Sequence, residues 1–162
     1  MNRERKYELL LAWCQICGGM LGIGILLWIP ITMPLNFFIQ HIILIAGMLT
    51  QGFSICCVIM ILKKRKNALT FSYINQCFQI LKFSVMGFGF HYVSGLSLLI
   101  GIELNETIYI LEAGSSSWFI QLNSDSVTKE ININIMALLI ILLIDYIKKI
   151  KRDKDVLSID ID

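Results

Sequence analysis

Five cysteines are the side chains of this sequence best suited to redox or metal chemistry: Cys14, Cys17, Cys56, Cys57 and Cys77. Cys14 and Cys17 have the spacing of a redox pair. Redox cysteines react as thiolates, which need a positive and partly exposed setting. The first pair instead lies in a long uncharged run, and only two histidines accompany the five cysteines. We therefore interpret them as small apolar residues and predict no metal site.

Three polar residues interrupt apolar segments and are candidates for function. His91 is an ionisable side chain in such a segment, and intramembrane ionisable residues are functional candidates. Gln51 is expected to form a hydrogen bond between helices. Asp145 lies three and four residues before Lys148 and Lys149, a spacing that favours ion pairs on one helix face.

Several classes of chemistry have no motif in this sequence. It contains no glycine-rich phosphate loop, no serine–histidine–acid set and no pair of catalytic carboxylates. We predict no catalytic residue and no cofactor. The basic clusters are short and follow apolar segments, so they indicate membrane orientation and not nucleic-acid binding.

Composition and apolar runs predict a membrane protein. Hydrophobic residues make up 56% of the 162 residues, charged residues make up 16%, and the mean hydropathy is +0.71. A transmembrane helix needs about 20 apolar residues, and four runs approach that length: 9–29, 41–62, 83–102 and 131–147. We predict one domain over residues 1–162, an all-α bundle of four transmembrane helices.

The segments between the predicted spans are shorter and more polar. Residues 71–81 carry apolar side chains at helical spacing, which is typical of an amphipathic helix on a membrane surface. Residues 103–130 are expected to form an outer loop. Two β-branched and aromatic stretches there, separated by a glycine and serine turn, favour a β-hairpin. Residues 148–162 form a cytoplasmic tail.

The basic residues define an orientation. With the N-terminus and the C-terminus in the cytoplasm, 13 of the 14 lysines and arginines lie on the inner side, as the positive-inside rule requires. These clusters are expected to attract anionic lipid headgroups. The frequent isoleucine, asparagine and lysine residues suggest a bacterial protein, so we expect the plasma (inner) membrane.

Small residues and two aromatic residues are candidates for contacts. Small side chains let membrane helices approach closely, and they recur at four-residue spacing as Gly18 and Gly22, and as Ala46, Thr50 and Ser54. We expect packing within the bundle, with a dimer face as the alternative. Trp118 and Phe119 of the predicted outer loop are candidate partner contacts.

Three functions follow from these expectations. The first is a non-enzymatic accessory, regulatory or immunity-type protein that acts through contacts in the membrane, with a membrane-protein partner or as a homo-oligomer. The second is an oligomeric channel or transporter subunit, with Gln51 and His91 lining the pore. The third is a membrane oxidoreductase that uses the cytoplasmic-side cysteines.

Overall fold

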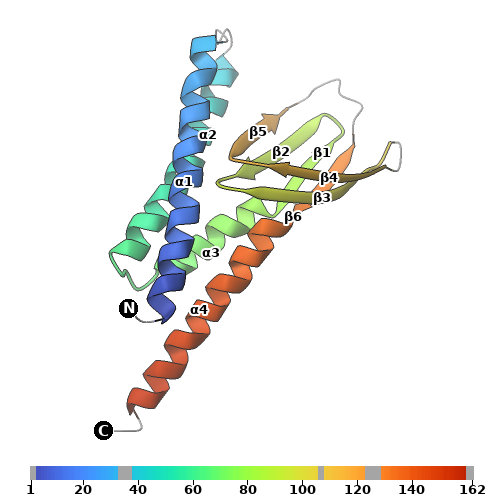
Figure 1. Ribbon diagram of the computed structural model, residues 1–162. Helices are drawn as coiled ribbons and strands as arrows, with labels where there is room; N and C mark the ends of the chain where they lie inside the picture. The colour runs from blue at the N-terminus through green and yellow to red at the C-terminus, as the bar shows by residue number, and fades with distance from the viewer. Residues whose placement is uncertain (1–2, 33–37, 106–107, 123–128, 160–162) are drawn as a thin grey trace.

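Two long helices form a hairpin along one side of the molecule. The computed structural model describes residues 3–32, 38–105, 108–122 and 129–159 (Figure 1), with side chains described for 5–153 of these. Helix α1 (Arg3–Thr32) and helix α2 (Phe38–Leu62) pack against each other along their length. Both are long and apolar enough to cross a membrane, and within the described residues no other helix meets that criterion.

Two further helices meet the hairpin at the end that holds the chain termini. Helix α3 (Ala68–Gln79) follows α2, and α4 (Ile135–Ile159) returns from the sheet (Figure 1). Apolar side chains from all four helices form a small core there: Leu11, Ala12, Val58, Ile61, Ala68, Leu69, Ile144 and Ile147.

A six-stranded antiparallel sheet lies beside the hairpin. Its strands are β1 (Leu81–Val85), β2 (Phe88–Val93), β3 (Ser97–Glu103), β4 (Ile108–Gly114), β5 (Ser117–Gln121) and β6 (Glu130–Asn134). Their order is β4-β3-β6-β1-β2-β5, so β4 and β5 are the edges. Met86 and Gly87 both have positive φ and turn β1 tightly into β2.

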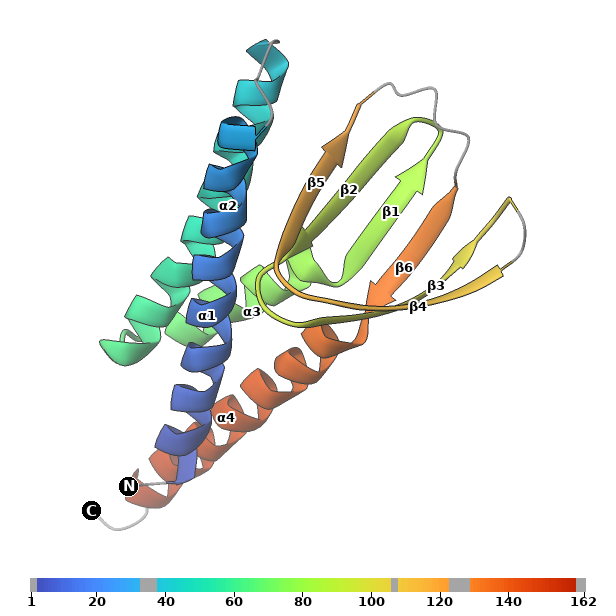
Figure 2. The same cartoon turned by 45° about the horizontal axis from the view of Figure 1, so that its top comes forward.

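The sheet is strongly curved. Lys82 of β1 lies 2.8 Å from a Glu112 oxygen of β4, although β6 and β3 separate these strands in the sheet order. Figure 2 shows β3 and β4 turning across the other strands. The concave face also holds Glu130, which lies 3.4 Å from Lys82. Strand alternation makes the outer face apolar, whereas the concave face carries the polar side chains together with Leu99, Ile110 and Phe119.

The prediction of an all-α bundle with four transmembrane helices is wrong. Residues 83–102 form β1, β2 and most of β3 instead of a third span. The alternating segment Phe88-Gly89-Phe90-His91 has the two-residue period of a strand, but a hydropathy average over twenty residues hides that alternation. Residues 131–147 are likewise divided between β6 and α4, because Ile131-Asn132-Ile133-Asn134 alternates in the same way.

The prediction of a hairpin within residues 103–130 is also wrong, because the two strands there pair with other strands. Strands β4 and β5 occupy the two predicted stretches, yet they do not pair with each other: β4 pairs with β3, and β5 pairs with β2. The described strands of this region, β4 and β5, therefore belong to the sheet and are not part of a separate loop outside a bundle. The part of the loop at 123–128 lies outside the described residues.

The distribution of polar and apolar side chains is inverted relative to a water-soluble protein. Among the described residues, fifteen polar or charged side chains are buried against fourteen apolar ones. Helix α3 turns Ser72, Asn75 and Gln76 inward, whereas its Phe78 is exposed. The outer sheet face and the free sides of α1 and α2 expose large apolar residues, among them Trp13, Met20, Trp28, Leu49, Phe88, Ile100, Ile131 and Ile133. Water-soluble proteins show the opposite distribution.

Candidate functional site

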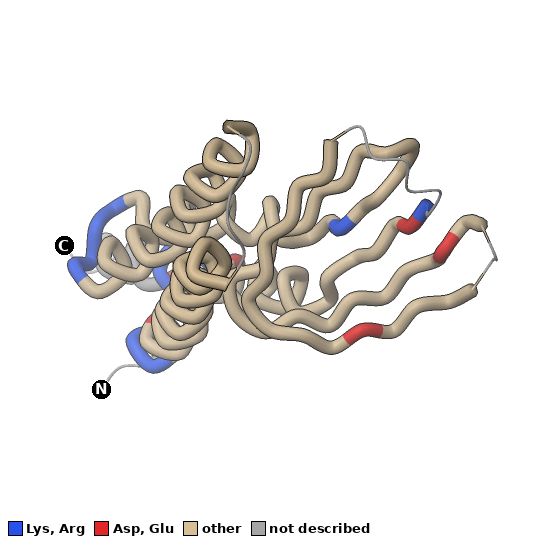
Figure 3. The backbone as a smooth tube through the Cα atoms, turned by 90° about the horizontal axis from the view of Figure 1, so that it is seen from above, with Lys and Arg blue, Asp and Glu red and all other residues tan. Residues whose placement is uncertain are grey.

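A basic pocket lies where the N-terminal part of α1, the α2–α3 turn and the second half of α4 meet. Its volume is about 350 Å³. The lining residues are Glu8, Ile61, Lys64, Arg65, Lys66, Ala68, Leu69, Thr70, Lys148, Lys151 and Arg152. Six of them are cationic and one is anionic. Figure 3 shows that lysine and arginine gather at this end of the molecule, beside both termini.

The end of α2 presents the first group of cations. The amide of Arg65 donates to the Met60 carbonyl and that of Lys64 donates to the Ile61 carbonyl, both at 3.0 Å. This pair of bonds closes the helix in a Schellman motif, whose left-handed position normally holds glycine. Here the position is Lys64, with φ of 53°. Lys64 therefore occupies a strained backbone position beside the pocket.

Glu8 neutralises part of the charge. Its carboxylate contacts Arg5 at 3.0 Å and Lys151 at 2.5 Å, and Arg5 also donates to the Ile61 carbonyl at 3.4 Å. These bonds fasten α1 to α4 and to the end of α2. Within the described part of the chain, the other five cations of the pocket form no ion pair with a carboxylate.

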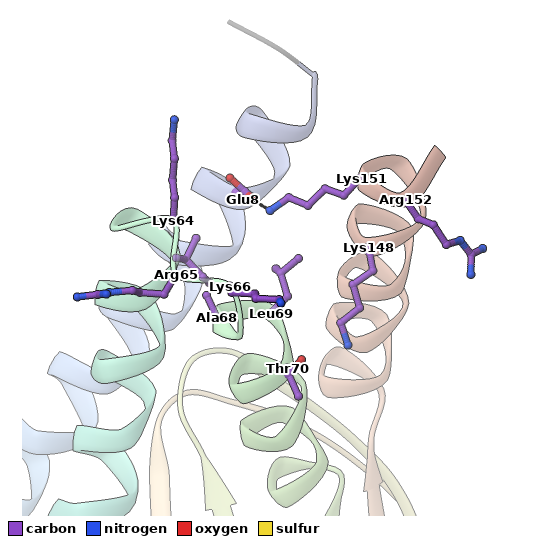
Figure 4. A pocket seen from close by; sticks show the side chains of 11 residues that line it. Glu8, Lys64, Arg65, Lys66, Ala68, Leu69, Thr70, Lys148, Lys151 and Arg152 are labelled. Atoms are coloured by element: carbon purple, nitrogen blue, oxygen red, sulfur yellow. Dashed lines mark ion pairs between the residues drawn. The ribbon is translucent and has the colours of Figure 1, made fainter. Parts of the chain in front are cut away.

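Two of the remaining cations extend towards the start of α3. In Figure 4 Lys66 and Lys148 extend towards the space between the α3 N-terminus and α4, whereas Lys64, Arg65 and Arg152 extend away from it. Asn67, at the N-cap position of α3, makes no side-chain capping bond. The amides of a helix N-terminus and nearby ammonium groups are the usual partners of a phosphate. The arrangement is suited to binding an anion.

We expect Lys64→Gly to stabilise the protein while weakening anion binding. Glycine adopts a positive φ without strain, and the relief of this strain is worth about 1 kcal/mol. The substitution also removes one cation from the lining of the pocket. Thermal unfolding in mild detergent and an anion titration measure the two effects on one sample. A lower melting temperature would contradict the assignment of strain to this residue.

His91 and Gln51 lie on opposite sides of β2. Gln51 of α2 is fully buried and donates to the Val93 carbonyl at 3.1 Å. His91 points to the concave face, where Nε2 lies 2.7 Å from the Ser117 hydroxyl. Burial and the nearby Lys82 ammonium lower the pKa of His91, so the imidazole is neutral at pH 7. No described carboxylate is hydrogen-bonded to it, so this is not a serine–histidine–acid set.

Asp145 and the cysteines are not brought together. Asp145 is exposed on α4, and no ion pair joins it to Lys148 or Lys149 within the described residues. All five cysteines are free thiols, and only Cys57 is buried. The searched part of the chain contains no group of three histidine, cysteine or acidic side chains able to hold a metal ion.

The small residues face several different neighbours. A Cβ added to Gly18 would lie 2.2 Å from the Gly95 amide nitrogen, and one added to Gly22 would lie 2.3 Å from the Gln51 side chain. Ser54 accepts a hydrogen bond from Asn75 at 3.2 Å. The Thr50 hydroxyl bonds to its own helix at the Gly47 carbonyl. Ala46, in the same row, is half-buried on α2.

The two aromatic candidates have different surroundings. The Trp118 ring packs beside Gly47 of α2, where an added Cβ would come within 2.9 Å of it. Phe119, on the concave side of β5, is 46% exposed. Of this pair, Phe119 is therefore the more accessible to a partner.

Sequence reasoning recognised both basic clusters but missed the site they form. It treated residues 63–66 and 148–152 as separate markers of orientation, since nothing in their spacing shows that α4 returns beside the α2–α3 turn. Glu8, one of two acids beside the N-terminal cations, was an available signal of an interhelical ion pair. Comparison with protein-family models, with curated proteins and with solved structures finds no match.

Proposed function

We propose that this protein is a non-enzymatic membrane protein that acts through contacts, with anionic lipid at its basic pocket and a second copy of the chain at its open sheet edge. The observation that carries the proposal is the inverted polarity. An apolar exterior around a polar interior is stable where the surrounding solvent is lipid and polar groups must find partners within the protein.

The two hairpin helices are the membrane-crossing elements in this proposal. Only about a third of the apolar window of each helix is buried, 39% in α1 and 28% in α2, which supports a placement of their free sides in lipid. The sheet lies beside the hairpin (Figures 1 and 2), and its outer face exposes Ile100, Ile102 and Phe88. We assign the exposed apolar sides of the two helices to lipid.

The charges support one orientation. Both termini and the basic pocket lie at the same end of the molecule (Figure 3). By the positive-inside rule this end is cytoplasmic, as in a bacterial plasma membrane. The pocket would then lie at headgroup level, where basic pockets between helices bind phospholipid headgroups.

Lipid titration tests the pocket. The full chain in a zwitterionic detergent is titrated with dioctanoyl phosphatidylglycerol or dioctanoyl phosphatidylcholine, and native mass spectrometry counts the bound lipids. We expect selective binding of the anionic lipid. Lys66→Ala combined with Lys148→Ala is expected to weaken it about thirtyfold, from about 1 kcal/mol for each cation.

A matched variant controls for the loss of charge. Lys63 and Lys149 are exposed cations at the same end that do not line the pocket. Replacing both with alanine should change the affinity no more than about twofold. Equal effects of the two double variants, or equal binding of the two lipids, would remove the pocket from the proposal.

The edge of β4 supports a chain contact. This seven-residue strand has β3 on one side and no described strand on the other. Tyr109 is 83% exposed and Leu111 is 73% exposed. Natural edge strands usually carry lysine, proline, a bulge or an inward-pointing charge that prevents pairing. Strand β4 contains no lysine or proline, and its one charged side chain, Glu112, is paired with Lys82. Antiparallel pairing with a second copy about Leu111 places Glu112 opposite Ile110, so no like charges meet.

Edge substitutions test this contact. We expect the wild type to be a dimer in mild detergent and Leu111→Lys to be a monomer, because a charged edge resists strand pairing. Phe88→Lys is the control, since Phe88 is exposed on the same apolar face but in an inner strand. Light scattering coupled to chromatography gives the protein mass. A monomeric wild type would exclude the dimer.

A further inference from the structure

An apolar groove lies between α2, α3 and β2. Its volume is about 310 Å³, within the range of small-molecule sites. Leu49 and Phe53 of α2, Phe78 of α3 and Phe90 of β2 supply its apolar lining. Leu49 is 69% exposed and Phe78 is 58% exposed, so the groove opens on the surface of the molecule. It shares no residue with the basic pocket.

The polar residues that line the groove already have partners within the protein. The Tyr92 hydroxyl lies 2.9 Å from both the Thr50 carbonyl and the Asn75 Oδ1. The Asn75 amide donates to the Ser54 hydroxyl at 3.2 Å, and the Thr50 hydroxyl donates to the Gly47 carbonyl at 2.8 Å. Because these groups are bonded to one another and to the backbone, a hydrocarbon chain can fill the groove without leaving them unpaired.

Exposed apolar side chains of α3 connect the groove with the basic pocket. Thr70, in the first turn of α3, lines the pocket, and Phe78, in its last turn, lines the groove. Between them Phe71 is 37% exposed and Ile74 is 39% exposed. Phe71, Ile74 and Phe78 are separated by three and four positions, which places them on one side of the helix. A chain along this side of α3 leads from the pocket to the groove.

The groove lies about one lipid leaflet away from the pocket along α2. Ile61 lines the pocket, whereas Phe53 and Leu49, 8 and 12 residues earlier, line the groove. At a rise of about 1.5 Å per residue, they lie about 12 and 18 Å from Ile61 along the helix axis. The hydrocarbon core of a bilayer is about 30 Å thick, so one leaflet contributes about 15 Å. A phospholipid with its phosphate at the pocket therefore has its chain ends at the depth of the groove.

We propose that the groove holds an acyl chain of the same anionic phospholipid whose headgroup occupies the basic pocket, an inference that rests on the lipid binding proposed above. The phosphate contacts Lys66 and Lys148, the chain follows the exposed side of α3, and its end lies between Phe78 and Phe90. Because the surrounding lipid is as apolar as the groove, the groove adds little affinity. The headgroup selects the lipid, and the groove determines where its chain lies.

Photolabelling of the full chain in phosphatidylcholine vesicles tests the proposal. The probes are phosphatidylglycerol and phosphatidylcholine, each with a diazirine at the end of a palmitoyl chain, and mass spectrometry maps the labelled residues. We expect phosphatidylglycerol, in contrast to phosphatidylcholine, to label the groove segments of α2, α3 and β2 preferentially. Lys66→Ala combined with Lys148→Ala should remove this preference, because the headgroup is no longer held.

Substitutions in the groove separate the chain from the headgroup. Phe78→Asn places an amide against the chain and should reduce groove labelling by phosphatidylglycerol about fivefold, and Leu49→Asn on the facing wall should act in the same way. The binding of dioctanoyl phosphatidylglycerol, whose chains are shorter, should change no more than about twofold. Phe88→Asn is the matched control, since Phe88 is 54% exposed but does not line the groove.

The outcomes distinguish this inference from the proposed function. Selective binding of dioctanoyl phosphatidylglycerol together with equal groove labelling by the two probes would overturn the chain site and leave the basic pocket in place. Preferential labelling that Phe78→Asn and Leu49→Asn do not change would also overturn it. If neither experiment shows a preference for phosphatidylglycerol, the pocket and the chain site are both wrong.

Discussion

Replacing Gly18 with alanine is expected to remove most of the folded protein. The added Cβ would lie 2.2 Å from the Gly95 nitrogen and 2.4 Å from the Ser94 carbonyl carbon. Both are backbone atoms of a turn that is bonded to α1 through Ser116, so no side-chain rotation relieves the clash. We expect a loss of about 3 kcal/mol or more, at the upper end of overpacking effects.

Gly24 provides the matched control on the same helix. A Cβ added there meets no atom within 4 Å. Gly24→Ala should be neutral or slightly stabilising, since alanine is the better helix former. The recovery of monodisperse protein after heating in mild detergent compares the two variants. Equal recovery would show that α1 does not touch the β2–β3 turn.

Tyr92→Phe is expected to destabilise the protein by about 1–3 kcal/mol, the cost of an unpaired buried group. Tyr92 is 2% exposed, and its hydroxyl lies 2.9 Å from both the Asn75 Oδ1 and the Thr50 carbonyl. The Tyr92 hydroxyl therefore links β2 to both α3 and α2. Phenylalanine keeps the ring but leaves the Asn75 oxygen without its donor.

Tyr109→Phe is the control for this second substitution. Tyr109 is on the outer face of β4 and is 83% exposed, so the loss of its hydroxyl should leave the melting temperature unchanged. If Tyr92→Phe melts at the wild-type temperature too, the polar contacts between the helices and the sheet do not stabilise the fold.

The hairpin helices were predictable from the sequence, whereas the sheet was not predicted. Residues 9–29 and 41–62 are uninterrupted apolar runs, and each falls within a helix of the structure. Residues 83–102 are also uncharged and apolar on average, but their apolar residues recur with a different period. The turn at Met86 and Gly87 and the alternation around His91 were the available evidence for strands.

The contacts that define the sites depend on long-range geometry. Phe53 and Phe90 are 37 positions apart in the sequence and line the apolar groove, and Lys66 and Lys148 are 82 positions apart and line the basic pocket. Local patterns carry no information on such pairs. The charge pattern did place cations at one end of the helices, which is where the pocket lies (Figure 4).

Cysteine labelling in intact cells tests the membrane placement most directly. Thr32→Cys, at the end of α1 opposite the termini, and Arg152→Cys, beside the basic pocket, are made in a background without the native cysteines. A membrane-impermeant maleimide should label position 32 from outside and position 152 only after permeabilisation. Labelling of both positions from the same side, or recovery of the chain in the detergent-free soluble fraction, would contradict a hairpin that crosses the bilayer.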